Sequence, residues 1–230
     1  CVVDTARKRV PVLIGTGAES TEDAVRYARE AEALGADGVM VIPPFYSTPT
    51  ADELFRHYER IADAIGIPIM LYNNPATANV DLTPPLVARL SEIEGVSYIK
   101  ESTMDVTRVR DIIDMCGERM QVFGGIMGFE SFVNGAVGWV SVGSNIMPGE
   151  FARLFTLTAD EQNYDEARQL YHELLPLIRL VGGHRYVSAT KSALHEIGVP
   201  VGQPRSPRLP TPDSEMPELM RVLQAVGLKS

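Results

Sequence analysis

The sequence predicts an α/β protein built on a parallel β-sheet. Short apolar runs begin at Val10, Gly38, Ile67 and Val96, and segments of helical periodicity separate them. The runs are mostly continuous rather than alternating, which is typical of strands covered by other elements on both faces. Strand, crossover helix and strand in regular succession predict parallel pairing with right-handed connections.

The first strand–helix unit has clear boundaries. Val10–Ile14 is predicted as a strand, and Gly15-Thr16-Gly17 ends it as a tight turn. Ser20 and Asp23 have the spacing of a capping box, and Gly35 is placed to end the helix that follows. Periodicity assigns to the inner face of this helix Ala24, Tyr27, Ala28, Ala31 and Leu34.

The following units repeat the pattern. Thr50 and Glu53 form a second capping box, and Thr83 precedes Pro84, a residue suited to the first helical position. The remaining strands are predicted over Gly38–Ile42, Ile67–Tyr72, Val96–Lys100, Met120–Gly124 and Gly138–Val142.

The pattern changes beyond residue 148, where strands give way to three predicted helices. A long helix ends near Val181, a second covers Tyr186–Ile197, and a short one covers Pro217–Val226 after a proline-rich stretch. We therefore expect a barrel domain over residues 1–147 and a helical extension over 148–230 that packs on it.

The strand count bears on the type of sheet. A closed (β/α)8 TIM barrel has eight strands, and six are visible in this chain. The alternatives are an open six-stranded sheet or a barrel whose first two strand–helix units are absent from the sequence. We favour the N-terminally incomplete (β/α)8 barrel with a C-terminal three-helix extension.

Composition excludes several classes of function. The net charge of -9, without a basic block, argues against nucleic acid and anionic membranes as partners. No apolar run approaches the roughly 20 residues that span a bilayer, and the N-terminus lacks the order of a signal peptide. Cys1 and Cys116 are the only cysteines, which indicates a reducing compartment, so we expect a cytoplasmic protein.

A phenol and an amine end two successive strands, at Tyr72 and Lys100. In a (β/α) barrel the carboxyl ends of the strands carry the chemistry. A lysine beside a tyrosine there suits imine chemistry on a keto acid. Taken singly, a lysine followed by Glu101 is more often a solvated charge, and a strand-end tyrosine is more often a packing residue.

Five motifs in one order resemble the dihydrodipicolinate synthase/N-acetylneuraminate lyase family of pyruvate-dependent class I aldolases. The resemblance extends along essentially the whole chain. The motifs are Gly15-Thr16-Gly17-Ala18, Pro43-Pro44-Phe45-Tyr46, Tyr72-Asn73-x-Pro75, Ile99-Lys100-Glu101-Ser102 and Gly138-Trp139-Val140-Ser141-Val142.

The resemblance implies roles for particular residues. Lys100 would form the Schiff base with the 2-keto group of pyruvate, Tyr72 would relay protons, and Tyr46 would reach the site of a neighbouring subunit. The keto acid would lie against the backbone near Val140 and against Gly125. The family usually assembles as a dimer of dimers, so a homo-oligomer, dimer or tetramer, is expected.

No metal or other cofactor is implied by the resemblance. The histidines His57, His172, His184 and His195 are scattered along the sequence, so they do not form a metal-binding motif. The expected partner is a small 2-keto acid such as pyruvate.

Two departures from the family pattern affect the expected substrate. The family's threonine-containing loop, which binds the pyruvate carboxylate, would precede Cys1. Thr77 occupies the place of an arginine that grips the aldehyde partner's carboxylate in the synthase branch, and threonine cannot make a bidentate contact. The sequence therefore argues against dihydrodipicolinate synthase activity itself. Ser102 stands where the sialic-acid lyase branch uses a hydroxyl towards its sugar.

The sequence thus supports a Schiff-base lyase or aldolase that cleaves or condenses a 2-keto acid of the 2-keto-3-deoxy sugar acid type with pyruvate. A dehydratase or deaminase using the same imine is the first alternative. A catalytically silent truncated homologue that only binds a ligand is the second. A doubly wound nucleotide-binding protein is a third, and it would need the six strands to form an open sheet. Gly15-x-Gly17 after a strand could suggest phosphate or dinucleotide binding, but the third glycine of that motif is missing.

Overall fold

The computed structural model describes residues 1–183 and 185–229, so His184 lies outside the described residues. The chain forms two compact units, Cys1–Val140 and Ser141–Ser230. The domain boundary expected after residue 147, and the packing of the extension on the barrel, stay predictions.

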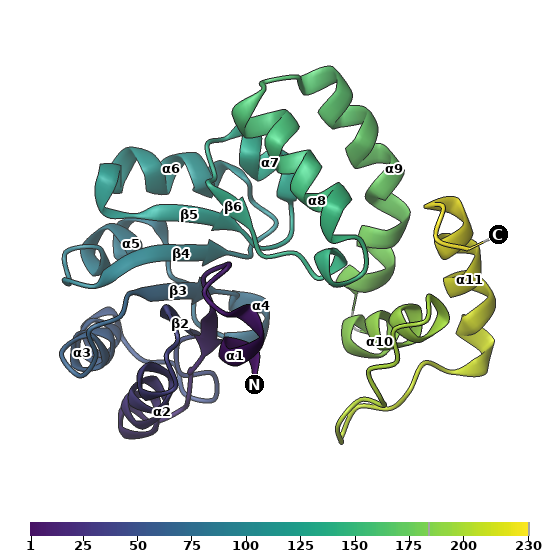
Figure 1. Ribbon diagram of the computed structural model, residues 1–230. Coiled ribbons are helices and arrows are strands. Elements are labelled where there is room, and N and C mark those ends of the chain that lie inside the picture. The colour runs from purple at the N-terminus through teal and green to yellow at the C-terminus, as the bar shows by residue number, and fades with distance from the viewer. Residues whose placement is uncertain (184, 230) are drawn as a thin grey trace. The chain divides into compact units, whose positions relative to one another are not determined.

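The first unit is built on a curled sheet of six strands that follow one another in sequence order (Figure 1). Every neighbouring pair is parallel, which confirms the predicted α/β architecture. The strands are β1 (Leu13–Gly15), β2 (Gly38–Val41), β3 (Ile69–Asn73), β4 (Val96–Glu101), β5 (Gln121–Gly124) and β6 (Gly138–Trp139).

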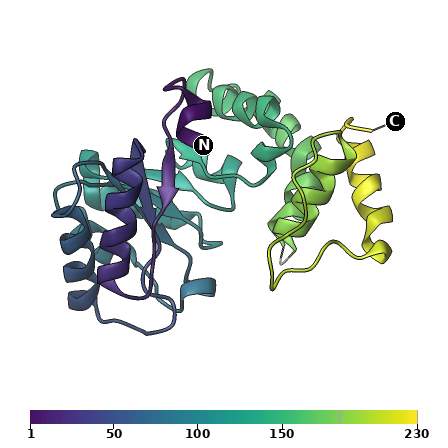
Figure 2. The same cartoon turned by 60° about the horizontal axis from the view of Figure 1, so that its bottom comes forward.

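Helices wrap around the outside of this sheet, and α2 lies beside α3 (Figures 1 and 2). The helical elements of the unit are α1 (Val2–Ala6), α2 (Thr21–Ala33), α3 (Ala51–Ala62), α4 (Pro75–Ala78), α5 (Pro84–Leu90), α6 (Thr107–Cys116), the 3₁₀ turn η1 (Gly117–Arg119) and α7 (Gly128–Val133). The predicted caps are confirmed: Ser20 accepts a bond from the Asp23 N–H, Thr50 and Glu53 form a capping box, and Thr83 is the N-cap of α5.

The inner face of α2 is narrower than its periodicity predicts. Ala24, Ala28 and Ala31 are buried, but the predicted inward residues Tyr27 and Leu34 are 39% and 69% exposed. A stripe of alanines lets the helix approach its neighbours closely, which leaves a large side chain such as Tyr27 at the edge. There the Tyr27 ring packs under the Arg26 guanidinium, 4.4 Å from the ring centre.

The turn after β1 depends on a close backbone approach. A Cβ atom on Gly17 would lie 2.6 Å from the Ile42 side chain and 3.0 Å from its backbone nitrogen. Gly17 therefore serves as a tight turn, in agreement with the interpretation of Gly15-Thr16-Gly17 as a strand-to-helix connection.

The second unit is helical. Its elements are the 3₁₀ turn η2 (Gly143–Asn145), α8 (Pro148–Phe155), the π-helical turn η3 (Thr156–Asp160), α9 (Tyr164–Gly182), α10 (Tyr186–Glu196), the 3₁₀ turn η4 (Asp213–Glu215) and α11 (Met216–Ala225). The predicted terminal helices are present as α9, α10 and α11, and α8 is an additional helix before Tyr164. Arg153 of α8 forms ion pairs with Glu161, which follows η3, and with Glu166 of α9. In residues 1–183 and 185–229, every helix is too short or too polar to cross a bilayer.

A buried histidine makes the stability of the first unit depend on pH. His57 of α3 is 5% exposed, and its Nδ1 atom lies 2.9 Å from the Thr21 hydroxyl. Desolvation by burial lowers the pKa of His57 to about 4. Because an unfolded chain protonates histidine near pH 6.5, acid favours the unfolded state, and this loss of stability begins below pH 6.5 and continues to pH 4.

We expect the wild type to lose about 2 kcal/mol more unfolding free energy between pH 7 and pH 5 than His57→Gln does. Urea unfolding at the two pH values measures the difference. His172→Gln, which removes an exposed histidine, is the matched control and should keep the wild-type pH dependence. Equal pH dependence in wild type and His57→Gln would contradict the assignment.

Candidate functional site

Tyr72 and Lys100 lie side by side at the carboxyl ends of β3 and β4. They are direct partners in the parallel ladder, so their side chains extend from the same face of the sheet. The Lys100 Nζ atom is 3.9 Å from the centre of the Tyr72 ring, and both side chains are partly buried. The structure therefore brings together the amine and the phenol that the sequence singled out.

Asn74 orients the Tyr72 phenol. Its Nδ2 atom donates a hydrogen bond to the Tyr72 hydroxyl oxygen at 3.0 Å. Because the oxygen accepts this bond, the hydroxyl hydrogen stays available for donation to another group. Asn74 is also the N-cap residue of α4, yet its side chain makes no capping bond. Sequence reasoning assigned Asn74 no role, although an asparagine before Pro75 is a recognisable N-cap signal.

Ser102 and Gly125 meet next to this pair. The Ser102 N–H donates to the Asn73 carbonyl at 2.9 Å, and the Gly125 N–H donates to the Glu101 carbonyl at 2.8 Å. A Cβ atom on Gly125 would lie only 1.8 Å from the Ser102 Oγ atom, so a glycine is required there. The Ser102 hydroxyl is buried without a hydrogen-bond partner among the described residues.

The other candidate residues lie farther along their loops. The Val140 N–H, just after β6, donates to the Gly124 carbonyl at 2.9 Å. Thr77 is an exposed residue of α4, and Tyr46 is 90% exposed in the connection between β2 and α3. Within the described residues, neither Thr77 nor Tyr46 is hydrogen-bonded to Lys100.

Glu19 fixes the loop that carries Tyr46. Its carboxylate accepts hydrogen bonds from the backbone N–H groups of Phe45, Tyr46 and Ser47, each at 2.9 Å, and from the Ser47 hydroxyl at 2.6 Å. These bonds, that of the Ser47 side chain foremost, lower the pKa of Glu19 to about 2. The anion therefore holds the loop at neutral pH. Glu19 follows the turn motif, and nothing in the sequence marked it.

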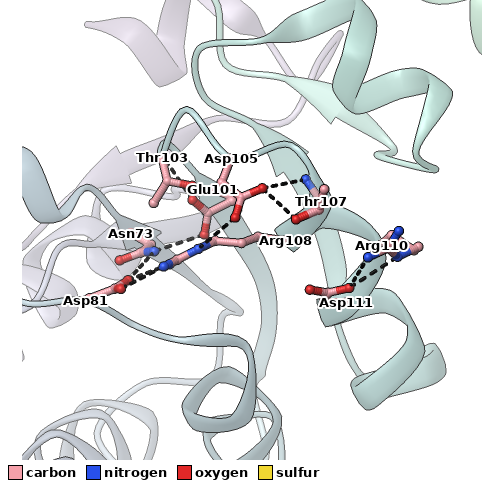
Figure 3. Close-up of polar contacts among 9 residues, drawn as sticks. All are labelled: Asn73, Asp81, Glu101, Thr103, Asp105, Thr107, Arg108, Arg110 and Asp111. Atoms are coloured by element: carbon pink, nitrogen blue, oxygen red, sulfur yellow. Dashed lines mark hydrogen bonds and ion pairs between the residues drawn. The ribbon is translucent and has the colours of Figure 1, made fainter.

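The residues that follow Tyr72 and Lys100 belong to a buried polar network, in which Asn73, Asp81, Glu101 and Arg108 are linked (Figure 3). Asn73 and Glu101 are the next residues of the two strands, so their side chains point to the opposite face, and they are 0% and 4% exposed. The Asn73 Nδ2 atom donates to Glu101 at 2.9 Å and to Asp81 at 3.2 Å. Its Oδ1 atom accepts from the Leu82 N–H at 2.9 Å.

Arg108 of α6 completes the network from outside the sheet. It holds Asp81 by two parallel bonds of 2.6 and 2.9 Å, and its hydrogen bonds lower the pKa of the Asp81 carboxyl. The other oxygen of Glu101 accepts from the Thr103 N–H at 2.7 Å. Glu101 is therefore a buried structural acceptor, not a solvated charge.

In residues 1–183 and 185–229, no group of three or more His, Cys, Asp or Glu side chains is arranged to hold a metal ion. The acidic residues of the buried network, Asp81 and Glu101, already accept bonds from Arg108, Asn73 and Thr103.

Curated relatives match nearly the whole chain. The 4-hydroxy-tetrahydrodipicolinate synthase of Syntrophobacter fumaroxidans is 38% identical over 229 residues, which cover 98% of this chain and 78% of the relative. That of Pelobacter propionicus is 37% identical over 229 residues, covering 99% of this chain and 79% of the relative.

Solved structures agree with the sequence relatives. The chloride-inhibited dihydrodipicolinate synthase of Acinetobacter baumannii, in complex with pyruvate, superposes with a TM-score of 0.93 at 33% identity. The match covers 99% of this chain and 78% of that one. The dihydrodipicolinate synthase of Aquifex aeolicus gives a TM-score of 0.93 at 30% identity, covering 98% of this chain and 78% of that one.

These relatives overturn one expectation. The argument from Thr77 against dihydrodipicolinate synthase activity is wrong, because four relatives that are 35–38% identical over nearly the whole chain are named 4-hydroxy-tetrahydrodipicolinate synthases. The physical flaw is that one exposed side chain on a short helix does not define a pocket to which several strand-end loops contribute.

The family assignment follows from sequence and fold together. The sequence profile of the dihydrodipicolinate synthetase family matches residues 1–226, that is, all of the first unit and all but the last four residues of the second. Tyr72 and Lys100, which belong to two of the five motifs that carry the resemblance, are ladder partners near the carboxyl ends of β3 and β4. The chain therefore belongs to the dihydrodipicolinate synthetase family of pyruvate-dependent class I aldolases.

Proposed function

We propose that this chain condenses pyruvate with an aldehyde through an imine on Lys100. The observation that carries the proposal is the placement of the Lys100 amine 3.9 Å from the Tyr72 ring, at the carboxyl ends of adjacent parallel strands. An amine and a phenol at that distance can serve one carbonyl group, the amine as nucleophile and the phenol as proton carrier.

The chemistry of the relatives' product defines the second substrate. A 4-hydroxy-tetrahydrodipicolinate has a seven-carbon skeleton, of which pyruvate supplies three carbons. The remaining four belong to an aldehyde that carries an amino group and a carboxylate. We assign this amino-acid aldehyde as the partner of pyruvate in the proposed reaction.

The proposed reaction passes through an imine and then an enamine on Lys100. The Lys100 nitrogen attacks C2 of pyruvate, and the carbonyl oxygen leaves as water with a proton that the Tyr72 hydroxyl delivers. Loss of a proton from C3 gives an enamine, whose C3 then bonds to the aldehyde carbon while the aldehyde oxygen takes a proton. Attack of the partner's amino group on C2 closes the ring and releases the Lys100 amine.

A cleavage reaction on a 2-keto-3-deoxy sugar acid is the second candidate. It is favoured by the Ser102 hydroxyl, which is buried beside Gly125 and has no partner among the described residues. A hydroxyl-bearing substrate would satisfy it, since a buried unpaired polar group is costly. The same imine on Lys100 would serve this reaction in the direction that releases pyruvate.

The proposed enzyme acts as a homo-oligomer, dimer or tetramer, in the cytoplasm. Tyr46 and Phe45 are 90% and 45% exposed on a loop that Glu19 holds in place, as suits a contact with a second copy. Cys1 and Cys116 are both free, in keeping with a reducing compartment. Sedimentation equilibrium of wild type and Tyr46→Ala measures the assembly, and a monomeric wild type would contradict it.

Borohydride trapping tests the proposed function. The protein is incubated with pyruvate, reduced, digested and mapped by mass spectrometry. We expect a reduced pyruvyl group on Lys100 and none on Lys8, Lys191 or Lys229. Absence of an adduct on folded protein, or an adduct only on another lysine, would refute the proposal. Assays with the amino-acid aldehyde and with 2-keto-3-deoxy sugar acids then separate the two candidate reactions.

A further inference from the structure

The first residues of the β3–β4 ladder do not set the register in which Tyr72 and Lys100 are paired. Ile69 pairs with Val96, whereas Met70 pairs with Tyr98, so a bulge shifts the register by one residue of β4. Beyond the bulge, a slip by one residue would turn the Lys100 side chain to the other face of the sheet. At the carboxyl end the register depends on the four ladder pairs beyond the bulge, and a side-chain interaction there would add to them.

The pair Asn73 and Glu101 supplies this interaction, since it follows Tyr72 and Lys100 directly in the ladder. The amide of Asn73 has a single satisfactory orientation. Its Oδ1 atom accepts from the Leu82 N–H, so its Nδ2 atom has to face the carboxylates of Glu101 and Asp81. A slipped or frayed strand end would leave these buried groups without partners.

The network also joins the two loops that follow the strands. Asp81 and Leu82 belong to the connection after β3, and Thr103 belongs to the turn after β4. Arg108 of α6 neutralises Asp81 through its paired bonds and is attracted to Glu101. The loop that bears Asn74, and with it the orientation of the Tyr72 phenol, is therefore tied to the strand that bears Lys100.

We propose that Asn73 and Glu101 are positioning residues that hold the Tyr72 phenol and the Lys100 amine in reactive register from the back of the sheet. This inference rests on the proposed imine chemistry. Neither residue touches the substrate, and each acts through the neighbouring residue of its own strand. Removing the Glu101 charge while keeping its size should misplace the pair without emptying the site.

The test uses pyruvate alone and follows exchange of its methyl protons with D₂O by NMR. Exchange requires both the imine and proton transfer at C3. It therefore measures the joint action of Lys100 and Tyr72 before any second substrate binds. For Glu101→Gln we expect the exchange rate per trapped site to fall by about 10- to 100-fold, with KM for pyruvate within about threefold of wild type. The final extent of borohydride trapping should equal that of wild type.

Ile112→Val is the matched control, because Ile112 is fully buried on α6 and lies outside the network. It removes one core methylene group and should exchange at the wild-type rate per trapped site. Arg108→Lys keeps the charge but loses the paired bonds to Asp81, and its exchange should fall several-fold. If Glu101→Gln is recovered unfolded, the exchange rate of Arg108→Lys alone tests the positioning role.

The outcomes separate the two proposals. Wild-type exchange per trapped site in Glu101→Gln, or in Arg108→Lys where that variant decides, overturns the positioning role and leaves the imine mechanism intact. A wild type that forms no adduct and exchanges no protons refutes the proposed function and the inference with it. A loss of exchange in Ile112→Val equal to that in Glu101→Gln also overturns the positioning role, because general loosening would then explain both.

Discussion

Replacing Lys100 by alanine is expected to lower the rate of the pyruvate reaction by roughly 10⁴-fold or more, as removal of a covalent nucleophile does in other enzymes. The reason is that no other lysine amine lies beside Tyr72 in the part of the chain that the structure describes. Steady-state assay with pyruvate and the amino-acid aldehyde measures the rate, and borohydride trapping measures the imine.

The alanine variant is expected to fold. Lys100 makes a contact with the Tyr72 ring but lies outside the buried network formed behind it, so its removal costs little stability. Lys8→Ala, which removes an exposed lysine, is the matched control and should retain full activity. A Lys100→Ala protein with wild-type turnover on the same substrates would end the imine hypothesis.

The pairing of Tyr72 with Lys100 could be predicted because it needs only local signals. Apolar runs locate the strands, crossover helices make them parallel, and parallel strands end at one edge of the sheet. Two residues at the ends of successive strands are then neighbours whatever the rest of the fold does. The structure places them as direct ladder partners.

The buried network behind Tyr72 and Lys100 could not be predicted in the same way. Asp81 and Arg108 are 27 residues apart in sequence, and nothing in either segment names the other as partner. Glu101 looks like a surface residue because it follows a lysine, and only the covering loop and α6 reveal that it is 4% exposed. Burial of a charge depends on tertiary partners, which no single strand pattern encodes.

The errors have a shared physical origin. Tyr27 was assigned to the inner face of α2 because hydrophobic periodicity counts apolar residues and not the room that their neighbours leave. The prediction from Thr77 excluded a substrate on the basis of one residue, without the other residues that line the pocket. In both cases a local rule was applied to a property that the packed neighbourhood decides.

The strongest expected effect on stability comes from Asn73→Asp. The Asn73 amide nitrogen lies 2.9 Å from an oxygen of Glu101 and 3.2 Å from one of Asp81, so the substitution places a third carboxylate where a donor is required. We expect a loss of about 3–5 kcal/mol at pH 7, the scale of an uncompensated buried charge.

The pH dependence of this loss follows from the same geometry. The surrounding carboxylates raise the pKa of the introduced carboxyl above its unfolded value of about 3.9, so the folded state gains a proton first as pH falls. The protonated oxygen can donate to Glu101 again, and the deficit relative to wild type therefore shrinks between pH 7 and pH 5. Urea unfolding at both pH values measures it, and the titration of His57, shared by both proteins, cancels in the difference. Asn79→Asp makes the same change at the exposed C-cap of α4, in the segment after β3, and should cost under about 0.5 kcal/mol. An Asn73→Asp protein as stable as Asn79→Asp would show that the amide is not the donor on which the two carboxylates depend.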